Sequence, residues 1–175
     1  MIAIIDYGMG NLGSVTKAFE FIGAKPKVTT SKIDINNSDG IVLPGVGAFK
    51  DAINKLKRFK LVKVIENNIK KGKPFLGLCL GLQLLFTESE EGGIFRGFNI
   101  FKGKVVRFKS GKNLLKVPHI GWNSIEIKKQ NNILSGIKNG TYFYFVHSYY
   151  VEPVDLDIIA AKTNYGIEFC SAIAK

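Results

Sequence analysis

The first half of the chain alternates short apolar runs with helix-like segments, and this alternation limits the possible folds most strongly. The apolar runs are residues 2–6, 26–30, 40–45 and 73–79. Apolar residues recur at helical spacing in residues 11–22, 48–59 and 61–72. The fourth run is apolar throughout, which is typical of a strand buried on both faces. The pattern predicts an α/β fold, with a parallel sheet flanked by helices.

The second half, from about residue 100, has a different pattern of residue types. Runs of β-branched and aromatic residues occupy positions 101–108, 123–127, 141–151, 158–165 and 167–175. The tetrapeptide NYGI, residues 164–167, has the composition of a hairpin turn. This half therefore predicts antiparallel strands. Because the sequence shows no repeat, low-complexity stretch or linker, we expect residues 1–175 to form a single domain.

Composition excludes several classes of protein. The net charge of +11 comes from lysines scattered along the chain, which favours a solvated surface over a nucleic-acid site. The two cysteines, Cys79 and Cys170, form no disulfide framework, and the cysteines and histidines lack metal-ligand spacing. The start of the chain has no signal-peptide pattern, and the longest apolar stretch is too short to span a bilayer. We expect a soluble cytoplasmic protein without cofactor or metal.

A glycine motif near the start resembles a dinucleotide-binding fingerprint. Gly8, Gly10 and Gly13 fit the pattern G-x-G-x-x-G between a strand and a helix, and Asp34 follows about twenty residues later. Two features oppose this interpretation. Asn11 is a good helix N-cap by itself, and Asp34 follows a polar loop where the ribose-binding acid should end a strand. We therefore favour a structural turn over a nucleotide site.

The segment GLCLG, residues 77–81, places Cys79 at the junction of a strand and a helix. The pattern G-x-C-x-G is the cysteine counterpart of a nucleophile elbow, whose tight turn leaves no room for neighbouring side chains. The following helix start should lower the thiol pKa, and the N–H of Leu80 is placed to hold an oxyanion. The alternative is that Cys79 is simply a core residue, since free cysteines are often buried.

The segment PGVG, residues 44–47, supports the nucleophile interpretation. It follows another predicted strand, at the edge where open α/β sheets bind ligands. A glycine-rich turn exposes backbone N–H groups there, so it could supply a second oxyanion donor. The two segments together favour an acyl-transfer site.

Several motifs occur in the order typical of one family. They are LPGVGAF, GLCLGLQLLF, SEE, PHIGWN and YFVHSY, after the opening IIDYGMGNLGSV. With these, the whole chain resembles the class I (triad) glutamine amidotransferases, and within them the glutaminase subunits of imidazole glycerol phosphate synthase. The resemblance implies a flavodoxin-like fold in which Cys79 attacks the side-chain amide of glutamine. Ammonia leaves, and water releases glutamate from a thioester.

The resemblance also implies a partner and a pathway. Ammonia would pass through a tunnel to a separate (β/α)8-barrel subunit of a heterodimer. There it would join a phosphorylated ribulose intermediate, giving imidazole glycerol phosphate and an aminoimidazole nucleotide in histidine biosynthesis. A related subunit that supplies a surface-sugar pathway remains an alternative. So does a catalytically inactive subunit that only docks on the barrel.

Matching positions imply roles for individual residues. The oxyanion would face the backbone of Gly45, Val46, Gly47 and Leu80. The glutamine pocket would contain Gln83, Glu91, His147, Ser148 and Tyr149. The barrel would meet residues 118–123, among them Pro118, His119, Trp122 and Asn123. Apart from the resemblance, each side chain also has a structural interpretation, such as a solvated acidic loop for Glu91 or a core position for Trp122.

One family segment is missing from the sequence. The catalytic base of the family is a histidine in an F-H-P-E segment near the C-terminus, and its glutamate completes the triad. This chain ends at Lys175 without that segment. We therefore expect either a fragment that lacks the family's C-terminal strand and helix, or a noncatalytic relative. Negligible glutaminase activity is expected of the 175 residues alone.

Overall fold

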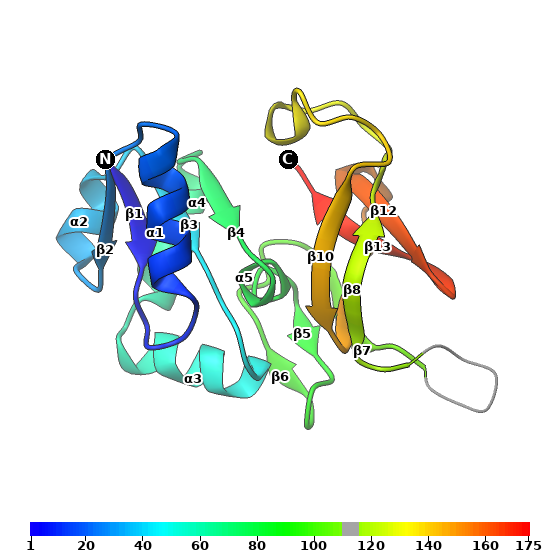
Figure 1. Ribbon diagram of the computed structural model, residues 1–175. Coiled ribbons are helices and arrows are strands. Elements are labelled where there is room, and N and C mark those ends of the chain that lie inside the picture. The colour runs from blue at the N-terminus through cyan, green and yellow to red at the C-terminus, as the bar shows by residue number, and fades with distance from the viewer. Residues whose placement is uncertain (110–115) are drawn as a thin grey trace. The chain divides into compact units, whose positions relative to one another are not determined.

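The computed structural model describes residues 1–109 and 116–175, which form two compact units (Figure 1). Unit 1 comprises residues 1–85 and 95–100, and unit 2 comprises residues 86–94 and 101–175. No helix in the described ranges is long and apolar enough to cross a membrane.

Unit 1 contains the predicted parallel sheet. Its strands are β1 (Ile2–Ile5), β2 (Pro26–Thr29), β3 (Gly40–Leu43) and β4 (Phe75–Gly77). They pair in the order β2-β1-β3-β4, and all three pairings are parallel. The strand order reverses direction between β1 and β3. In open α/β sheets the carboxyl ends at such a switch point form the ligand-binding crevice.

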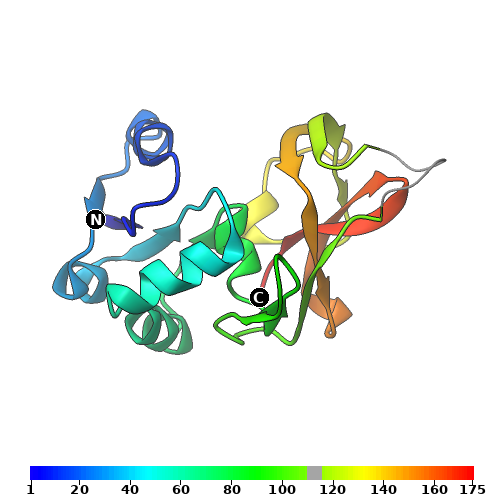
Figure 2. The same cartoon turned by 90° about the horizontal axis from the view of Figure 1, so that it is seen from below.

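The helices of unit 1 cover both faces of this sheet. They are α1 (Leu12–Phe21), α2 (Lys32–Asn37), α3 (Phe49–Arg58) and α4 (Val62–Lys70). In Figures 1 and 2, α1 lies on one face, and α2, α3 and α4 lie on the other. Right-handed crossovers require this arrangement, because the connection from β1 to β2 runs along the sheet in the opposite direction to the later ones.

Amphipathic helix α3 shows how the core of unit 1 forms. Phe49, Ala52, Ile53 and Leu56 are buried, while Lys50 and Asp51 between them are exposed. This spacing of three and four residues places all four side chains on one stripe of the helix. Each large apolar side chain buried in this way contributes about 1.5–3 kcal/mol. In contrast, α1 has no buried residue, although its sequence predicted an apolar face.

Two helices differ from the sequence-based expectation. Helix α2 was not predicted, although Ser31 caps it by accepting a hydrogen bond from the N–H of Asp34. The sequence predicts a further helix from Leu80 to Phe86, but the helix α5 spans only Leu80–Gln83. Just beyond α5, the carbonyls of Leu84 and Leu85 accept hydrogen bonds from the N–H groups of residues 98 and 100, in the returning segment of unit 1.

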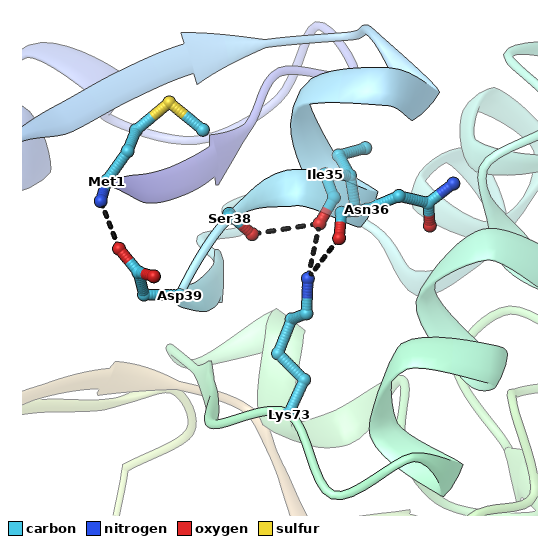
Figure 3. Close-up of polar contacts among 6 residues, drawn as sticks. All are labelled: Met1, Ile35, Asn36, Ser38, Asp39 and Lys73. Atoms are coloured by element: carbon cyan, nitrogen blue, oxygen red, sulfur yellow. Dashed lines mark hydrogen bonds and ion pairs between the residues drawn. The ribbon is translucent and has the colours of Figure 1, made fainter.

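The amino-terminal edge of the sheet is closed by polar contacts (Figure 3). The Lys73 ammonium donates to the carbonyls of Ile35 and Asn36 at 2.9 and 2.8 Å. The Ser38 hydroxyl also donates to Ile35, at 2.8 Å. A cation next to β4 thus caps the last carbonyls of α2, where the helix dipole favours positive charge.

Unit 2 is built mainly from antiparallel strands, as its sequence predicted. Its strands are β5 (Glu88–Ser89), β7 (Gly103–Arg107), β8 (His119–Ser124), β9 (Glu126–Ile127), β10 (Tyr142–His147), β11 (Tyr149–Pro153), β12 (Ile159–Tyr165) and β13 (Ile167–Ile173). Strand β6 (Phe95–Arg96) belongs to unit 1, and two 3-10 turns in unit 2 span Asn132–Leu134 and Leu156–Ile158.

The strands of unit 2 pair in two groups. One group has the order β5-β7-β11-β13-β12-β9, and β8 and β10 form a separate antiparallel pair. The predicted hairpin at NYGI is confirmed, since Tyr165 pairs with Ile167 around Gly166, whose φ is +68°. The predicted strand at 141–151 is instead two strands, β10 and β11, separated at Ser148.

Candidate active site

Cys79 lies on a sharp turn between β4 and α5. Its φ of +54° and ψ of −108° are unusual for a residue with a side chain, and its thiol is exposed. Such a conformation costs about 1–3 kcal/mol and persists only where surrounding contacts hold it. The Cys79 carbonyl accepts hydrogen bonds from Leu82 and Gln83, at 3.0 and 3.2 Å, and Leu78 donates to Leu43 at 3.0 Å. These bonds fix the turn on both sides of the sulfur.

The two glycines around Cys79 allow three backbone segments to meet. A Cβ added to Gly81 would lie 1.9 Å from the carbonyl oxygen of Leu43. A Cβ added to Gly77 would lie 2.7 Å from the carbonyl oxygen of Gly81. Neither distance is compatible with a side chain. The turn therefore needs glycine at both positions, which is the steric requirement of a nucleophile elbow.

The loop after β3 lies against this turn. A Cβ on Gly45 would lie 2.8 Å from Leu80 Cβ and 3.3 Å from the nitrogen of Gly81, so the structure brings the PGVG segment to the elbow. Val46 and Gly47 are exposed, and Gly47 has a φ of +98°. Within the described residues, no acceptor takes a hydrogen bond from the N–H of Gly45, Val46, Gly47 or Leu80. Val46 and Gly47 are exposed and can meet a ligand oxygen directly, whereas Gly45 and Leu80 are buried.

Tyr7 is a residue of this region that the sequence analysis did not select. It is fully buried and its hydroxyl donates to the carbonyl of Pro44 at 2.9 Å. Burial first, and the neighbouring Cys79 second, raise the pKa of Tyr7, so it remains a protonated donor. The only sequence signal for it is the phenol directly after the apolar run of β1.

The glutamine-pocket residues that the sequence predicted fall in both units. Gln83 is half-buried at the end of α5 in unit 1. Glu91 in unit 2 is half-buried in the turn after β5, and its N–H donates to the hydroxyl of Ser89 at 3.2 Å. His147, Ser148 and Tyr149 are half-buried at the junction of β10 and β11.

His147 belongs to a continuous chain of hydrogen bonds in unit 2. Its Nδ1 lies 2.8 Å from the carbonyl oxygen of Tyr149, and its Nε2 lies 2.9 Å from Nδ1 of His119. His119 Nε2 lies 3.3 Å from the amide nitrogen of Asn123, which also donates to the carbonyl of Asn164 at 2.9 Å. Residues from β8, β10, β11 and β12 are joined in this way.

The Tyr149 carbonyl, at one end of this series of hydrogen bonds, determines the tautomers of both imidazoles. A carbonyl only accepts, so Nδ1 of His147 carries the proton and Nε2 accepts from Nδ1–H of His119. Burial first, and His147 second, lower the pKa of His119 to about 4. Burial also lowers the pKa of His147, against the opposing effect of the Tyr149 carbonyl. Both rings are therefore neutral at pH 7.

The predicted partner-contact residues of unit 2 point in two directions. His119 is only 2% exposed, and Asn123 is half-buried beside it. Trp122 is 70% exposed and Pro118 is also exposed. The pairing of β8 with β10 puts Trp122 opposite Tyr144, with ring centroids 5.7 Å apart. The outer face of this pair is an exposed apolar and aromatic surface formed by Ile120, Trp122, Tyr142, Tyr144 and Val146.

The glycine motif at residues 8–13 takes part in no feature specific to a dinucleotide site. Asn11 caps α1 by accepting from the N–H of Ser14 at 3.1 Å. Gly13 has no atom within 4 Å of an added Cβ, so it serves no close helix–strand contact. Asp34 lies in α2 and accepts from Lys27 and Thr29, both at 2.8 Å, so its oxygens are already engaged. No cluster of three or more metal-ligating side chains occurs in residues 1–109 or 116–175.

These features agree with the comparison to known families. The family model described as "Glutamine amidotransferase class-I" matches residues 3–175, and the chain belongs to this family. Among curated relatives, "Imidazole glycerol phosphate synthase subunit HisH" of Caldanaerobacter subterraneus subsp. tengcongensis is 53% identical over 175 residues, covering 100% of this chain and 85% of the relative. The protein of the same name from Aquifex aeolicus is 51% identical, covering 97% of this chain and 81% of the relative.

Solved structures of low sequence identity show the same fold. A structure titled "Crystal structure of glutamine amidotransferase" aligns with a TM-score of 0.69 at 12% identity, covering 95% of this chain and 86% of that one. The structure of PurLQS from Thermotoga maritima aligns with a TM-score of 0.68 at 19% identity, covering 93% and 73%. The predicted class I glutamine amidotransferase fold is confirmed.

Proposed function

We propose that this chain is the glutamine-hydrolysing subunit of an imidazole glycerol phosphate synthase and acts in the cytoplasm as one domain. The exposed thiol of Cys79 on its strained turn, with free N–H groups beside it, is the observation that carries the proposal. The names of the relatives support the assignment to this synthase.

The proposed reaction converts glutamine and water into glutamate and ammonia. The Cys79 thiolate forms a bond to the amide carbon, and the carbonyl electron pair moves onto oxygen. The N–H groups of Gly45, Val46, Gly47 and Leu80 stabilise this oxyanion. The proton that Cys79 gave up on becoming a thiolate passes to the nitrogen, so that collapse expels ammonia and leaves a glutamyl thioester. Water then adds to the thioester carbon, glutamate is released, and a proton of that water returns to the sulfur.

The remaining residues bind the substrate and the partner in this proposal. Gln83 and Glu91 hold the amino-acid end of glutamine, and the backbone and side chains of residues 147–149 line the pocket. A (β/α)8-barrel subunit docks on the region of Pro118 and Trp122 and receives the ammonia. His119 and Asn123 support that region from within through their hydrogen bonds. His119 and His147 bond to each other, so neither is assigned as the catalytic base.

Covalent labelling tests the nucleophile directly. A chloroketone analogue of glutamine should alkylate Cys79, with a sulfur–carbon bond replacing the carbon–chlorine bond and chloride leaving. Mass spectrometry should find one adduct, at Cys79, and added glutamine should protect against it. A chloroketone without the amino and carboxyl groups should react much more slowly. Labelling of Cys170, or equal rates for both reagents, would contradict the proposal.

Cys170 provides the matched control. It is 7% exposed, and burial raises the pKa of its thiol to about 12. A Cys170→Ala variant should keep its labelling at the wild-type rate, whereas Cys79→Ala should lose it. With the barrel subunit and glutamine, these 175 residues alone should release negligible glutamate, because the segment with the family's catalytic base is not among them.

A further inference from the structure

The loop after β1 supports the loop after β3 at the switch point of the parallel sheet. A Cβ on Gly10 would lie 3.3 Å from Cβ of Pro44, and one on Gly47 would lie 2.9 Å from Cε of Met9. Lys55 of α3 donates to the carbonyl of Gly8 at 2.8 Å and holds the first loop from the other side. The glycine motif thus lets two loops pack closely together.

Tyr7 makes the polar contact between these loops. Its hydroxyl donates to the carbonyl of Pro44 at 2.9 Å in a fully buried position. A Cβ on Gly45 would lie only 2.7 Å from the same hydroxyl. The phenol therefore lies directly against the peptide that joins Pro44 to Gly45.

Because a peptide unit is planar, the contact of Tyr7 with the Pro44 carbonyl also affects the direction of the Gly45 N–H. The bond between Pro44 and Gly45 is trans, so its C=O and N–H point in opposite directions in one plane. A hydrogen bond that fixes the carbonyl direction also fixes the direction of the Gly45 N–H. That N–H has no acceptor among the described residues.

We propose that Tyr7 is a positioning residue for the oxyanion hole. Its hydroxyl holds the Pro44 carbonyl and so keeps the Gly45 N–H directed at the oxygen that becomes negative when Cys79 attacks. The proposal rests on the proposed role of Cys79. It predicts that the Tyr7 hydroxyl matters for acyl transfer and not for simple alkylation of the same sulfur.

Two reagents separate these reactions. With the γ-p-nitrophenyl ester of glutamate, the thiolate adds to the carbonyl carbon, an oxyanion forms, and p-nitrophenolate leaves with its electron pair and needs no proton. With iodoacetamide, the thiolate displaces iodide from a saturated carbon, and no oxyanion forms. The ratio of the two rates at Cys79 reports the oxyanion hole alone.

The decisive variant is Tyr7→Phe, which removes one oxygen atom from the full chain. Loss of one oxyanion donor costs roughly 100- to 1,000-fold in rate, and a misdirected donor retains part of its effect. We expect release of p-nitrophenolate to slow by about 10-fold or more, with alkylation by iodoacetamide within about twofold of wild type. The control is Tyr150→Phe, which removes a phenol hydroxyl that donates to the Glu152 carboxylate. It should change neither rate.

A second variant tests the same proposal if Tyr7→Phe does not fold. Gly10→Ala leaves the phenol in place and pushes on Pro44 through its new Cβ, so it should lower the same rate ratio. An unchanged ratio in the folded Tyr7→Phe variant, or an equal loss in both reactions, would overturn the Tyr7 proposal and leave the nucleophile in place. If the wild type releases p-nitrophenolate no faster than Cys79→Ala, the proposed function itself fails.

Discussion

The two edges of the parallel sheet in unit 1 differ in the hydrogen bonding of the backbone groups beside them. At the amino-terminal edge, Lys73 and Ser38 donate to the last carbonyls of α2 (Figure 3). At the carboxyl-terminal edge, Cys79 has an unfavourable backbone conformation, and the N–H groups of the neighbouring loop have no acceptor in the described residues. The carbonyls of Ile35 and Asn36 thus have donors at one edge, whereas the other edge combines a strained nucleophile with unbonded N–H groups.

This difference shows how a small fold supports a strained site. Unsatisfied backbone groups and positive φ angles each cost free energy, so the rest of the unit must supply stability. The buried stripe of α3 and the closed amino-terminal edge are suited to that role. Substitutions at the amino-terminal edge should therefore change stability alone, whereas those at the carboxyl-terminal edge should also change the reactivity of Cys79.

The largest effect is expected from Gly81→Ala at the carboxyl-terminal edge. Its Cβ would lie 1.9 Å from the carbonyl oxygen of Leu43, and backbone on both sides would have to move. We expect a loss of about 3 kcal/mol in the free energy of unfolding, measured in urea, and loss of Cys79 labelling. Normal labelling in this variant would show that the elbow tolerates a side chain and would break the comparison.

The imidazoles of His119 and His147 in unit 2 extend the comparison to hydrogen-bonded groups that can also gain a proton. His119 has a folded-state pKa of about 4, below its ordinary value of 6.5, so the unfolded chain binds its proton first as the pH falls. Stability should therefore be complete above pH 6.5, decline toward pH 4, and level off below it.

Urea titrations at several pH values measure this effect. The wild type should lose about 2 kcal/mol more than His119→Gln between pH 6.5 and 4.5. The difference between the two proteins removes the contribution of carboxylates that titrate in the same range. Parallel pH profiles would mean that His119 is not held neutral by its surroundings.

Lys73→Met tests the amino-terminal edge. The variant removes two charge-assisted hydrogen bonds to Ile35 and Asn36 and keeps most of the side-chain volume. We expect a loss of about 1–2 kcal/mol in unfolding free energy, since water can replace part of the interaction. The rates of Cys79 with the ester and with iodoacetamide should not change. A slower ester reaction would show that the two edges are coupled.

The smallest effect is expected from Gly13→Ala. An added Cβ would have no neighbour within 4 Å, and alanine favours a helix over glycine. A gain of about 0.5–1 kcal/mol is expected by thermal or urea unfolding. NAD should not raise the melting temperature of either protein. A shift with NAD that disappears in the variant would revive the nucleotide-binding interpretation.

The parts of the fold with a strong local pattern were predictable from sequence. The parallel sheet, the cap at Asn11 and the hairpin at Gly166 follow from periodicity and turn residues. The glycines at the elbow predicted a tight turn, because a turn of this kind excludes side chains locally.

Features that depend on distant partners were not predictable in this way. The residues that follow α5 bond to residues 98 and 100 and not to a further helical turn, and no local signal reveals these partners. Helix α2 has six residues, so its capping pair at Ser31 and Asp34 was its main signal and was missed. The contact of Tyr7 with Pro44 spans 37 positions of the sequence and becomes visible only when β1 and β3 are paired.

The same limit applies to the residues around Trp122. Alternation along β8 separates His119 and Asn123 from Ile120 and Trp122, but the sequence alone does not show which set faces inward. The pairing with β10 and the hydrogen bonds of His119 decide it.

The exposure of Trp122 has a practical consequence. It is the only tryptophan in the chain, so the tryptophan fluorescence of the protein originates from one indole ring on the outer face of β8. Any molecule that covers this ring and excludes water from it would shift the emission to shorter wavelength. The chain therefore contains its own optical probe for occupancy of that face, and a titration can be followed without attaching a dye.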